Sequence, residues 1–286
     1  MKYPEKYESE INFETLSIRS KRSFSQNWLV NSNAQSRVTD SLGVLLAKYP
    51  EAKLVEIGPG KGHLTKHLLD ITNNFTAIEL DREAAQFLRS QSWFSSDKIN
   101  LVEADALELL KTQSEYFKDS ILYSSLPYSV GSRILVELGQ NFPNTPFCVI
   151  IQREVAQKTQ LNSGKLTFFG AYLNLFWNLK IAFNLSKGNF SPAPKVTSSV
   201  LIGTPKDFEF GVSPAKIRKL LHILMADSKK TLANNLRGLS WSQVEIRQFL
   251  LTNELDEKTR LTAHNYVAIL KLLVSRTNLN ESITLK

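Results

Sequence analysis

A glycine-rich turn near the start of the chain has the residue types needed to hold a nucleotide-like ligand. Residues 53–57 form an apolar run typical of a buried parallel strand, and Gly58, Gly60 and Gly62 follow it. These glycines lack a Cβ atom, so the backbone can turn tightly and approach a ligand closely. Residues 63–69 then predict a helix whose first amides face that ligand. Taken alone, the pattern also fits an ordinary strand-to-helix turn.

Two carboxylates follow the next two predicted strands. Glu79 lies in the run 75–80, about 20 residues after the glycine turn, where a carboxylate can accept hydrogen bonds from both hydroxyls of a ribose. A dinucleotide site uses the same geometry, so this pair does not by itself identify the cofactor. Asp105 follows a third strand near 99–103, and its carboxylate can accept from the amino group of an adenine. The alternative for Asp105 is a cap of the helix that follows.

The tetrapeptide Ser-Leu-Pro-Tyr at 125–128 ends a further predicted strand and indicates an amine-bearing planar substrate. Methylation of an exocyclic amine requires its lone pair, normally delocalised into the ring, to point at the methyl donor. The Ser125 hydroxyl and the Leu126 carbonyl can hold the amine hydrogens, Pro127 stiffens the loop, and the Tyr128 ring can stack on the base. An ordinary strand-ending turn is the alternative. Together with the two carboxylates, the tetrapeptide predicts an S-adenosylmethionine-dependent amino-methyltransferase.

At these motifs the chain resembles the ribosomal-RNA adenine N6,N6-dimethyltransferases, over residues from about 21 to 239. The segments 24–29, 151–156 and 190–200 extend the resemblance, and the last has closely spaced prolines followed by Lys-Val. In that family a Gln-Asn-x-Leu segment folds over the cofactor. The resemblance implies that S-adenosylmethionine is bound by Asn27, Leu29, Gly58, Gly60, Glu79, Asp105 and Ser125, and that the catalytic site comprises Ser125, Leu126, Pro127, Tyr128 and Phe190.

One residue in this set departs from the family pattern. The family usually has Asn where this chain has Ser125. Serine retains a hydroxyl acceptor, but it is shorter and lacks the amide. By the same resemblance, Phe190 would close the second face of the adenine.

Two branches of this superfamily differ in their RNA target. The turn 60–65 resembles the erythromycin-resistance methylases, which modify one adenosine in large-subunit rRNA. Residues 228–236 resemble a basic helix of the small-subunit dimethylases, which modify two adjacent adenosines near the 3′ end of 16S-type rRNA. The family helix usually carries a Gln-Arg-Arg-Lys run, and Asp227-Ser228 replaces its beginning here. We favour the small-subunit branch and keep the large-subunit branch as the alternative.

The charge of the chain agrees with an RNA partner. Its 286 residues carry a formal net charge of +8, with a pI near 9.4, and neutralisation of phosphates dominates affinity for nucleic acids. Residues 206–286 hold 13 Lys and Arg against 8 Asp and Glu. A basic protein with solvated charges is the alternative, as is a merely solvated helix face for Lys229 and Lys230. The expected RNA-binding residues are Lys195, Lys229, Lys230 and Arg237.

The remaining composition argues against several classes of protein. The single cysteine, Cys148, lies in an apolar strand and excludes an internal disulfide framework. The four histidines have no Cys or Glu at metal-ligand spacing, so we expect no metal. Neither a signal peptide nor an apolar run of membrane-spanning length is present, so we expect a cytoplasmic protein with no membrane partner. We also expect a monomer.

The order of predicted elements indicates an α/β fold. A helix at about 32–48 precedes strands near 54–57, 75–80, 99–103, 121–125 and 147–151, which alternate with helices as in a doubly wound, mostly parallel sheet. Residues 171–177 predict a buried helix, and 180–185 and 197–203 predict two final strands, added antiparallel at the edge. From 213 to about 275 the pattern is helical. We therefore expect a loosely ordered segment 1–20, a Rossmann-like class I methyltransferase domain 21–205 and a helical RNA-binding domain 206–286.

The predicted reaction is direct transfer of the methyl group to a neutral adenine N6. Orientation and dipoles aimed at the nitrogen would supply most of the acceleration, and no strong base is required. A second hypothesis comes from another class of protein, a ribosome-assembly or RNA-binding factor whose catalysis is weakened by Ser125. Intact Glu79 and Asp105 argue against complete loss of cofactor binding in that case.

Overall fold

The computed structural model describes residues 27–163 and 165–278 of the chain. The predicted loose segment 1–20 and residues 24–26 of the segment 24–29, which contains Gln-Asn-x-Leu, lie outside these ranges. In chain order the helices and strands are β1 Trp28–Leu29, α1 Ser32–Lys48, β2 Lys53–Ile57, α2 Thr65–Leu68, β3 Phe75–Glu79, α3 Arg82–Arg89, β4 Ile99–Glu103, α4 Ala106–Lys111, β5 Ser120–Ser125, α5 Gly131–Asn141, β6 Phe147–Gln152, α6 Arg153–Gln157, α7 Phe168–Leu173, β7 Trp177–Leu185, β8 Phe190–Ser191, β9 Ser198–Pro205, α8 Pro214–Leu224, α9 Leu232–Leu236, α10 Gln243–Thr252 and α11 Tyr266–Asn278. Short 3₁₀ turns cover Glu115–Phe117, Leu161–Ser163 and Lys187–Asn189.

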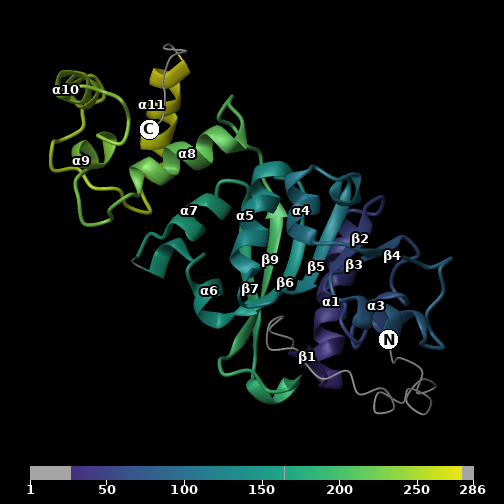
Figure 1. The fold of residues 1–286 in the computed structure, drawn as a ribbon. Coiled ribbons are helices and arrows are strands. Elements are labelled where there is room, and N and C mark those ends of the chain that lie inside the picture. The colour runs from purple at the N-terminus through teal and green to yellow at the C-terminus, as the bar shows by residue number, and fades with distance from the viewer. Residues whose placement is uncertain (1–26, 164, 279–286) are drawn as a thin grey trace. The chain divides into compact units, whose positions relative to one another are not determined.

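Seven strands form one sheet in the order β4-β3-β2-β5-β6-β9-β7 (Figure 1). The five strands from β4 to β6 are parallel, and β9 joins β6 in the antiparallel sense. Strand order reverses between β2 and β5, which is the point where open α/β sheets bind ligands beyond the carboxyl ends of the strands. The predicted α/β, doubly wound and mostly parallel sheet is confirmed.

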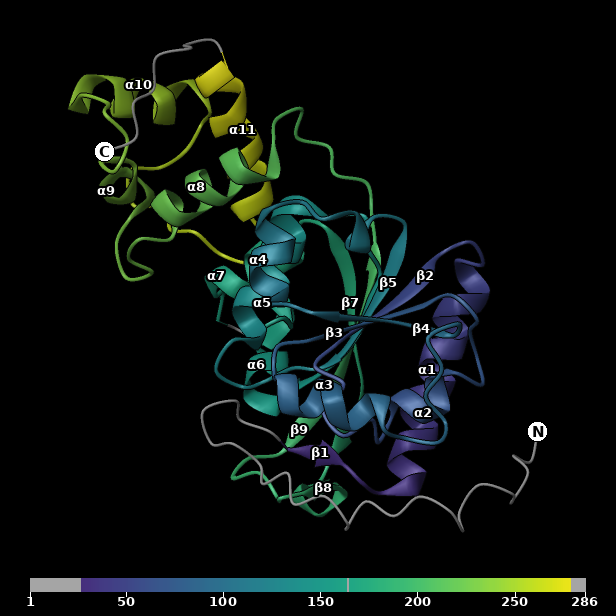
Figure 2. The same cartoon turned by 45° about the vertical axis from the view of Figure 1, so that its right-hand side comes forward.

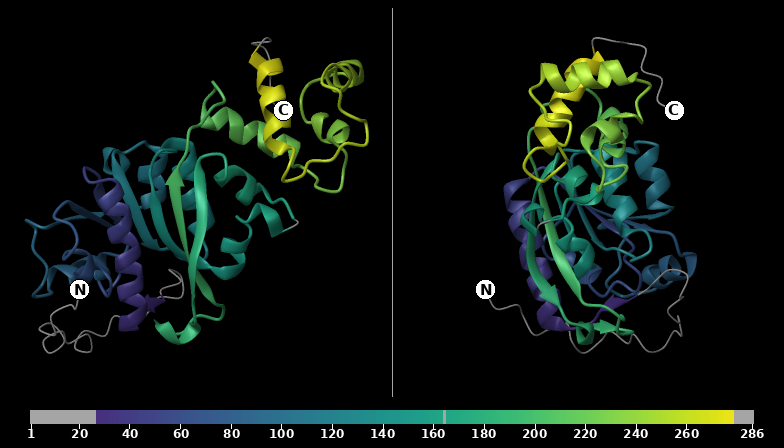
Figure 3. Two further views of the ribbon diagram at one scale, coloured as in Figure 1. Left: turned by 180° about the vertical axis from the view of Figure 1, so that it is seen from behind. Right: turned by 90° about the vertical axis from the view of Figure 1, so that its left-hand side faces the viewer.

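Helix α1 covers one face of this sheet because its apolar residues recur every three to four positions. The helix runs along the sheet (Figure 3). Its side chains Ala34, Val38, Leu42 and Leu45 are buried in the same cluster as side chains from the central strands. The Asn31 side chain caps the helix by accepting from the amide of Ala34 at 3.0 Å. Helix α4 lies on the opposite face of the sheet (Figure 2). The sheet is therefore covered on both sides, which explains why its strands read as continuous apolar runs.

Two predicted helices are wrong in their limits. The helix predicted at 63–69 covers only Thr65–Leu68. The helix predicted at 171–177 is α7, Phe168–Leu173, and Trp177 already belongs to strand β7. Thr167 caps α7 by accepting from the Gly170 amide at 3.1 Å. Capping groups and the sheet, rather than apolar content alone, set where this segment changes from helix to strand.

The chain divides into two compact units that we describe separately. The first comprises Met1–Ile134, Thr145–Arg153 and Lys180–Gly203, and the second Leu135–Asn144, Glu154–Leu179 and Thr204–Lys286. The second unit therefore takes in segments that lie before residue 206, the predicted start of the helical domain. The sequence-based domain limits remain a prediction.

Helices α8 to α11 make up the carboxyl-terminal part of the second unit. Helix α8 contacts α7, α9 and α11, and Arg218 on α8 donates to Glu137 at 3.0 Å. The buried side chain of Asn235 on α9 donates to the carbonyl of Leu224 at 2.9 Å. Helix α10 begins with a capping box between Ser242 and Glu245. Within the described part of the chain, no helix is both long and apolar enough to cross a membrane.

Candidate active site

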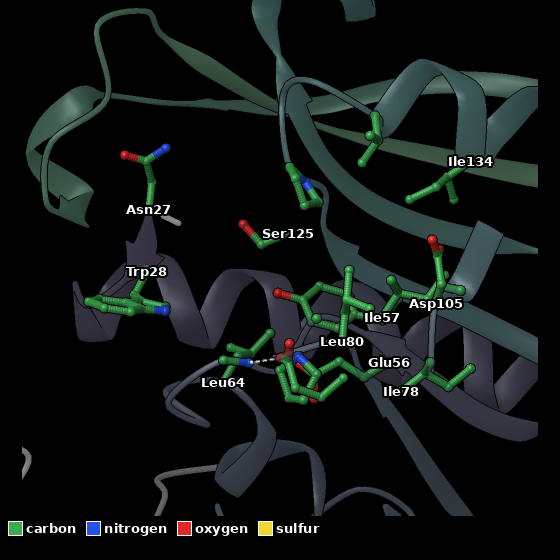
Figure 4. Close-up of a pocket in the computed structure, with 18 of the residues that line it drawn as sticks. Asn27, Trp28, Glu56, Ile57, Leu64, Ile78, Leu80, Asp105, Ser125 and Ile134 are labelled. Atoms are coloured by element: carbon green, nitrogen blue, oxygen red, sulfur yellow. Dashed lines mark hydrogen bonds between the residues drawn. The ribbon is translucent and has the colours of Figure 1, made fainter. Parts of the chain in front are cut away.

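A cavity of about 320 Å³ opens beyond the carboxyl ends of the parallel strands in the first unit (Figure 4). Residues from β2, β3 and β5 and from the loops after them form its walls. Ser125 lies between Asn27 on one side and Asp105 on the other (Figure 4). All seven residues predicted to hold the cofactor line this cavity: Asn27, Leu29, Gly58, Gly60, Glu79, Asp105 and Ser125.

The glycine turn forms one wall, and its backbone conformation requires glycine. Gly58, Gly60 and Gly62 have φ angles of 69°, 56° and 75°, in the left-handed region that other residues rarely adopt. A Cβ atom on Gly60 would lie 2.7 Å from the indole nitrogen of Trp28. The helix predicted at 63–69 is shorter than expected, because α2 starts only at Thr65 and has four residues. Gly58, Pro59 and Gly60 of the turn line the cavity, as do His63 and Leu64 just before α2. Contact between the first helical amides and a ligand stays a prediction.

Glu79 is buried at the end of β3 and braces the glycine turn. One carboxylate oxygen accepts from the Gly60 amide and the other from the Asp81 amide, both at 2.9 Å. Burial raises the pKa of Glu79, and the two amide hydrogen bonds oppose this effect. Each oxygen keeps a second lone pair, so the carboxylate can still accept from ligand hydroxyls.

Asp105 follows β4 and combines the two roles that the sequence left open. One of its oxygens accepts from the Leu107 amide at 2.8 Å and caps α4. The helix cap is therefore confirmed. The same side chain lines the cavity, so contact with an adenine amino group stays a prediction alongside the cap.

Glu56 is a cavity residue that sequence reasoning missed. It lies within β2, is only 4% exposed and accepts from the Thr65 hydroxyl at 2.7 Å. Burial is the main cause that raises its pKa to about 8, and the charge of Glu79 adds to it, while the Thr65 hydrogen bond opposes it. A glutamate inside an otherwise apolar strand was the signal that could have revealed it.

The tetrapeptide at 125–128 bends away from the end of β5 at the rim of the cavity. Ser125 and Pro127 line the cavity, while Leu126 is buried and its amide donates to Ile150 at 3.0 Å. The Pro127 carbonyl accepts from the Gly131 amide at 2.9 Å and leads into α5. Tyr128 is half-buried next to this turn and is not among the residues that line the empty cavity.

We call residues 27–31 the N-terminal strap. Its first three residues, Asn27, Trp28 and Leu29, line the cavity opposite Asp105. Strand β1 of the strap pairs with β8, so that Leu29 lies opposite Phe190 (Figure 2). Phe190 is 5% exposed and packs in the same apolar cluster as Leu29, away from the lining of the empty cavity. Stacking of Phe190 on the second face of the substrate adenine stays a prediction.

A buried glutamine ties the strap to the glycine turn. The Gln35 side-chain amide donates to the carbonyl of Leu29 at 2.8 Å and to that of His63 at 3.2 Å. Sequence reasoning missed Gln35, because nothing in the local pattern distinguishes a buried glutamine from an exposed one on α1.

Two ring side chains complete this wall and were also missed. The Trp28 ring covers Gly60, and the Lys61 ammonium lies 4.7 Å from the centre of that ring. His63 lines the cavity, and burial, with the charges of Lys61 and Lys66, lowers its pKa to about 4. The imidazole is therefore neutral at physiological pH.

The comparison with known families identifies this arrangement. Residues 18–275 match the model of a family described as ribosomal RNA adenine dimethylase.

The chain belongs to this family.

Curated relatives support the assignment over most of the chain. The ribosomal RNA small subunit methyltransferase A of Bdellovibrio bacteriovorus is 32% identical over 233 residues, which cover 79% of this chain and 80% of that protein. The protein of the same name from Acidobacterium capsulatum is 32% identical over 237 residues, covering 81% of this chain and 82% of the relative. The chain is therefore a methyltransferase that requires a methyl donor.

Solved structures show the same fold at low sequence identity. A dimethyladenosine transferase from Plasmodium falciparum matches with a TM-score of 0.68 at 18% identity, covering 90% of this chain and 99% of that one. The 23S rRNA methyltransferase ErmE matches with a TM-score of 0.62 at 19% identity, covering 89% and 100%. Both related branches thus share this architecture.

The residues predicted to bind RNA are exposed in this dimethylase-family chain. Lys195 precedes β9 in the first unit, and Arg237 ends α9 in the second. Lys229 and Lys230 were expected on a helix, but they lie in a turn before α9, where the Asp227 carboxylate accepts from the Lys229 amide at 2.9 Å. This local hydrogen bond competes with helix formation, and α9 begins only at Leu232.

The cysteine and the possible metal ligands considered in the sequence form no reactive site in the described structure. Cys148 is buried in β6, and burial raises the pKa of its thiol to about 12, so it is an inert core residue as predicted. Within residues 27–163 and 165–278, no three His, Cys, Asp or Glu side chains gather at a position that could hold a metal.

Proposed function

We propose that this chain transfers methyl groups from S-adenosylmethionine to the N6 atoms of two adjacent adenosines near the 3′ end of small-subunit rRNA. The observation that carries the proposal is one cavity that brings the glycine turn, Glu79 and Asp105 together with the tetrapeptide residues Ser125 and Pro127. The names of the curated relatives support the small subunit as the target.

In this proposal the cofactor lies across the carboxyl ends of β2, β3 and β4. Glu79 accepts from the ribose hydroxyls, since its charged oxygens already point at the glycine turn that the ribose would approach. Asp105 uses the oxygen that does not cap α4 to accept from the adenine amino group. The apolar side chains of Ile57, Ile78 and Leu80 supply the surface on which the adenine of the cofactor packs.

The chemistry is an in-line displacement at the methyl carbon. The bond from sulfur to the methyl group breaks as the bond from N6 to that carbon forms, and the resulting ammonium loses a proton to water. Ser125 and the Leu126 carbonyl hold the amine hydrogens so that the nitrogen lone pair points at the methyl group. The enzyme's part is therefore orientation of two bound molecules, an effect that can supply about 7–11 kcal/mol of a barrier.

RNA binding by the helical segment 206–286 is part of the proposal. Lys229, Lys230 and Arg237 are exposed around α9. Lys230 lies 3.7 Å from Asp227, a surface pair whose energy is small enough for a phosphate to replace the carboxylate. One copy of the chain suffices, because the seven predicted cofactor residues belong to one cavity.

The test is methylation of small subunits whose rRNA lacks the dimethyladenosines. Purified protein, labelled S-adenosylmethionine and these subunits should give labelled small-subunit rRNA and a primer-extension stop at two adjacent adenosines, since dimethyladenosine blocks Watson–Crick pairing. Large subunits serve as the matched substrate. Label in large-subunit rRNA alone would assign the chain to the resistance branch and overturn the proposal.

The assembly-factor alternative makes a different prediction in the same assay. It expects S-adenosylmethionine binding by calorimetry with no methyl transfer by the natural protein, and a sharp gain in transfer for Ser125→Asn. Our proposal expects transfer by the natural protein and a fall of roughly 10²-fold or more for Ser125→Ala with cofactor affinity nearly unchanged, because the hydroxyl acts mainly in the transition state.

A further inference from the structure

Tyr128 is attached to a strand that lies far from it in sequence. Its hydroxyl and the Ser198 hydroxyl share a hydrogen bond of 2.6 Å across 70 residues of chain. Tyr128 is half-buried, whereas Ser198 is fully buried at 0% exposure. The hydroxyl of Tyr128 is therefore anchored to a buried residue, while its chain neighbours Pro127 and Ser129 line the cavity.

The anchor belongs to the seven-stranded sheet. Ser198 is the first residue of β9, which lies between β6 and the edge strand β7, and it pairs with Gln152 at the end of β6. The Arg153 amide donates to the Thr197 carbonyl at 2.9 Å and continues this pairing by one residue. A side chain held at such a position can impose its geometry on a loop residue, because the sheet moves less than the loop.

We propose that Ser198 is a positioning residue that sets the plane of the Tyr128 ring and thereby the direction of the adenine amine. This inference rests on the proposed function and on the stacking of the substrate base on Tyr128 that the sequence predicts. A stacked base adopts the plane of the ring, so a tilt of the ring turns the N6 lone pair away from the methyl donor. The amine then meets the donor less often in the reactive geometry.

The second methyl transfer depends on this alignment more than the first. Monomethyl-adenine must rotate its amine and place a bulkier nitrogen, with one hydrogen left to be held by Ser125 or the Leu126 carbonyl. In the first transfer, both amine hydrogens help to orient the nitrogen. In the second, one hydrogen has been replaced by a methyl group, and the Tyr128 ring plane fixed by Ser198 supplies part of the missing orientation. Loss of the Ser198 hydroxyl should therefore reduce dimethylation more than monomethylation.

The chain contains a matched control next to Ser198. Ser199 is also 0% exposed and also lies on β9, but its side chain points to the other face of the sheet and donates to Asn184 at 2.7 Å. Ser199→Ala removes a buried hydroxyl and its hydrogen bond without touching Tyr128. A general weakening of β9 would affect both serine variants alike.

The experiment measures mono- and dimethyladenosine in unmethylated small subunits treated with the natural protein, Ser198→Ala, Ser199→Ala, Tyr128→Phe and the double variant Ser198→Ala/Tyr128→Phe. Products are compared at equal total methyl incorporation, so that the ratio does not depend on the fraction of folded enzyme. Tyr128→Phe keeps the stacking ring and removes the same hydrogen bond, and it tests the inference even where Ser198→Ala folds poorly.

The expected result is a fall in kcat of roughly 10-fold and a several-fold shift towards monomethyladenosine in both Ser198→Ala and Tyr128→Phe. The double variant should be no worse than either single variant, because both remove one interaction. Cofactor affinity and the Ser199→Ala product ratio should match the natural protein.

Three outcomes would overturn the inference while the proposed function stands: unchanged products in Ser198→Ala, an additive loss in the double variant, or an equal shift in Ser199→Ala. Absence of methyl transfer by the natural protein would instead overturn the proposed function, and the inference with it.

Discussion

At the scale of single residues, the carboxylate of Glu79 connects the glycine turn to the predicted ribose site. It accepts from the amides of Gly60 and Asp81 and has lone pairs left for two hydroxyls. Because Glu79 is buried, removing its carboxylate leaves hydrogen-bond donors without an acceptor, and this loss costs free energy.

We expect Glu79→Ala to weaken S-adenosylmethionine binding by about 1.5–3 kcal/mol, which is a rise in Kd of roughly 10- to 150-fold, measured by calorimetry. Glu103→Ala is the matched control, since Glu103 lies directly opposite Glu79 on β4 but pairs with Arg82 and Arg89 outside the cavity. Unchanged affinity in a folded Glu79→Ala protein would remove the carboxylate from the cofactor site.

The raised pKa of Glu56 predicts that the stability of the folded protein depends on pH. Its carboxyl has a pKa of about 8 in the folded protein, raised by burial from an ordinary value near 4.5. Between these values the folded chain holds a proton that the unfolded chain releases, so this contribution to stability is fully present below the lower value and is lost as the pH rises through about 8.

The melting temperature of the natural protein should therefore fall from pH 5 to pH 9, and Glu56→Gln should remove a large part of that fall. Glu103→Gln, which changes an accessible carboxylate, should leave the pH profile as it is. Equal pH profiles for the natural protein and Glu56→Gln would mean that Glu56 is ionised in the folded chain.

At the scale of elements, the cavity depends on two short segments that are held by apolar packing of Leu29 and Phe190 and by specific hydrogen bonds. Strand β1 has two residues, and two residues of β8 are its partner in a separate small sheet. Such a short pairing contributes little by itself. Gln35 on α1 holds the strap against the glycine turn through two carbonyls that belong to different walls of the cavity.

Gln35→Leu should weaken cofactor binding by roughly 5-fold and at most about 150-fold, because two hydrogen bonds of about 0.5–1.5 kcal/mol each no longer join the walls. The change in tryptophan fluorescence on cofactor addition that is lost in Trp28→Phe offers a second measurement. In the control Gln91→Leu, the lost amide donates only to Phe87 and Ser90 close by in sequence, and affinity should not move. Equal cofactor affinity in the natural protein, Gln35→Leu and Gln91→Leu would mean that the strap stays in place without Gln35.

At the scale of the whole molecule, we expect the net charge of +8 to favour association with RNA. Lys229 and Lys230 are exposed in the turn before α9, and replacing both with Ala should flatten the salt dependence of binding to small subunits by up to about two phosphate contacts. Cofactor affinity should stay the same.

The double variant Lys111→Ala/Lys118→Ala is the control for net charge. These exposed lysines of the first unit pair with Glu108 and Glu115, so the substitutions change the charge by the same amount at a different place. Equal salt slopes for the two double variants would show that only the overall charge matters, and that Lys229 and Lys230 are solvated side chains.

The sequence by itself determined the parallel sheet and most residues around the cavity. Strand periodicity, the glycines with positive φ and the carboxylates after β3 and β4 are local features, because the carboxyl ends of parallel strands meet at one edge wherever the strands pair. For the same reason Ser125 and Pro127 could be placed at that edge from their position after β5.

Only the tertiary structure decided which side chains act on these groups from a distance. Glu56, Gln35 and Ser198 each depend on a partner that another segment supplies, and no local pattern specifies which segment will lie there. The same holds for the limits of α7, where the Thr167 cap and the strand β7 override apolar content. Long-range packing sets these contacts, since a buried polar group must find its hydrogen-bond partner wherever the fold provides one.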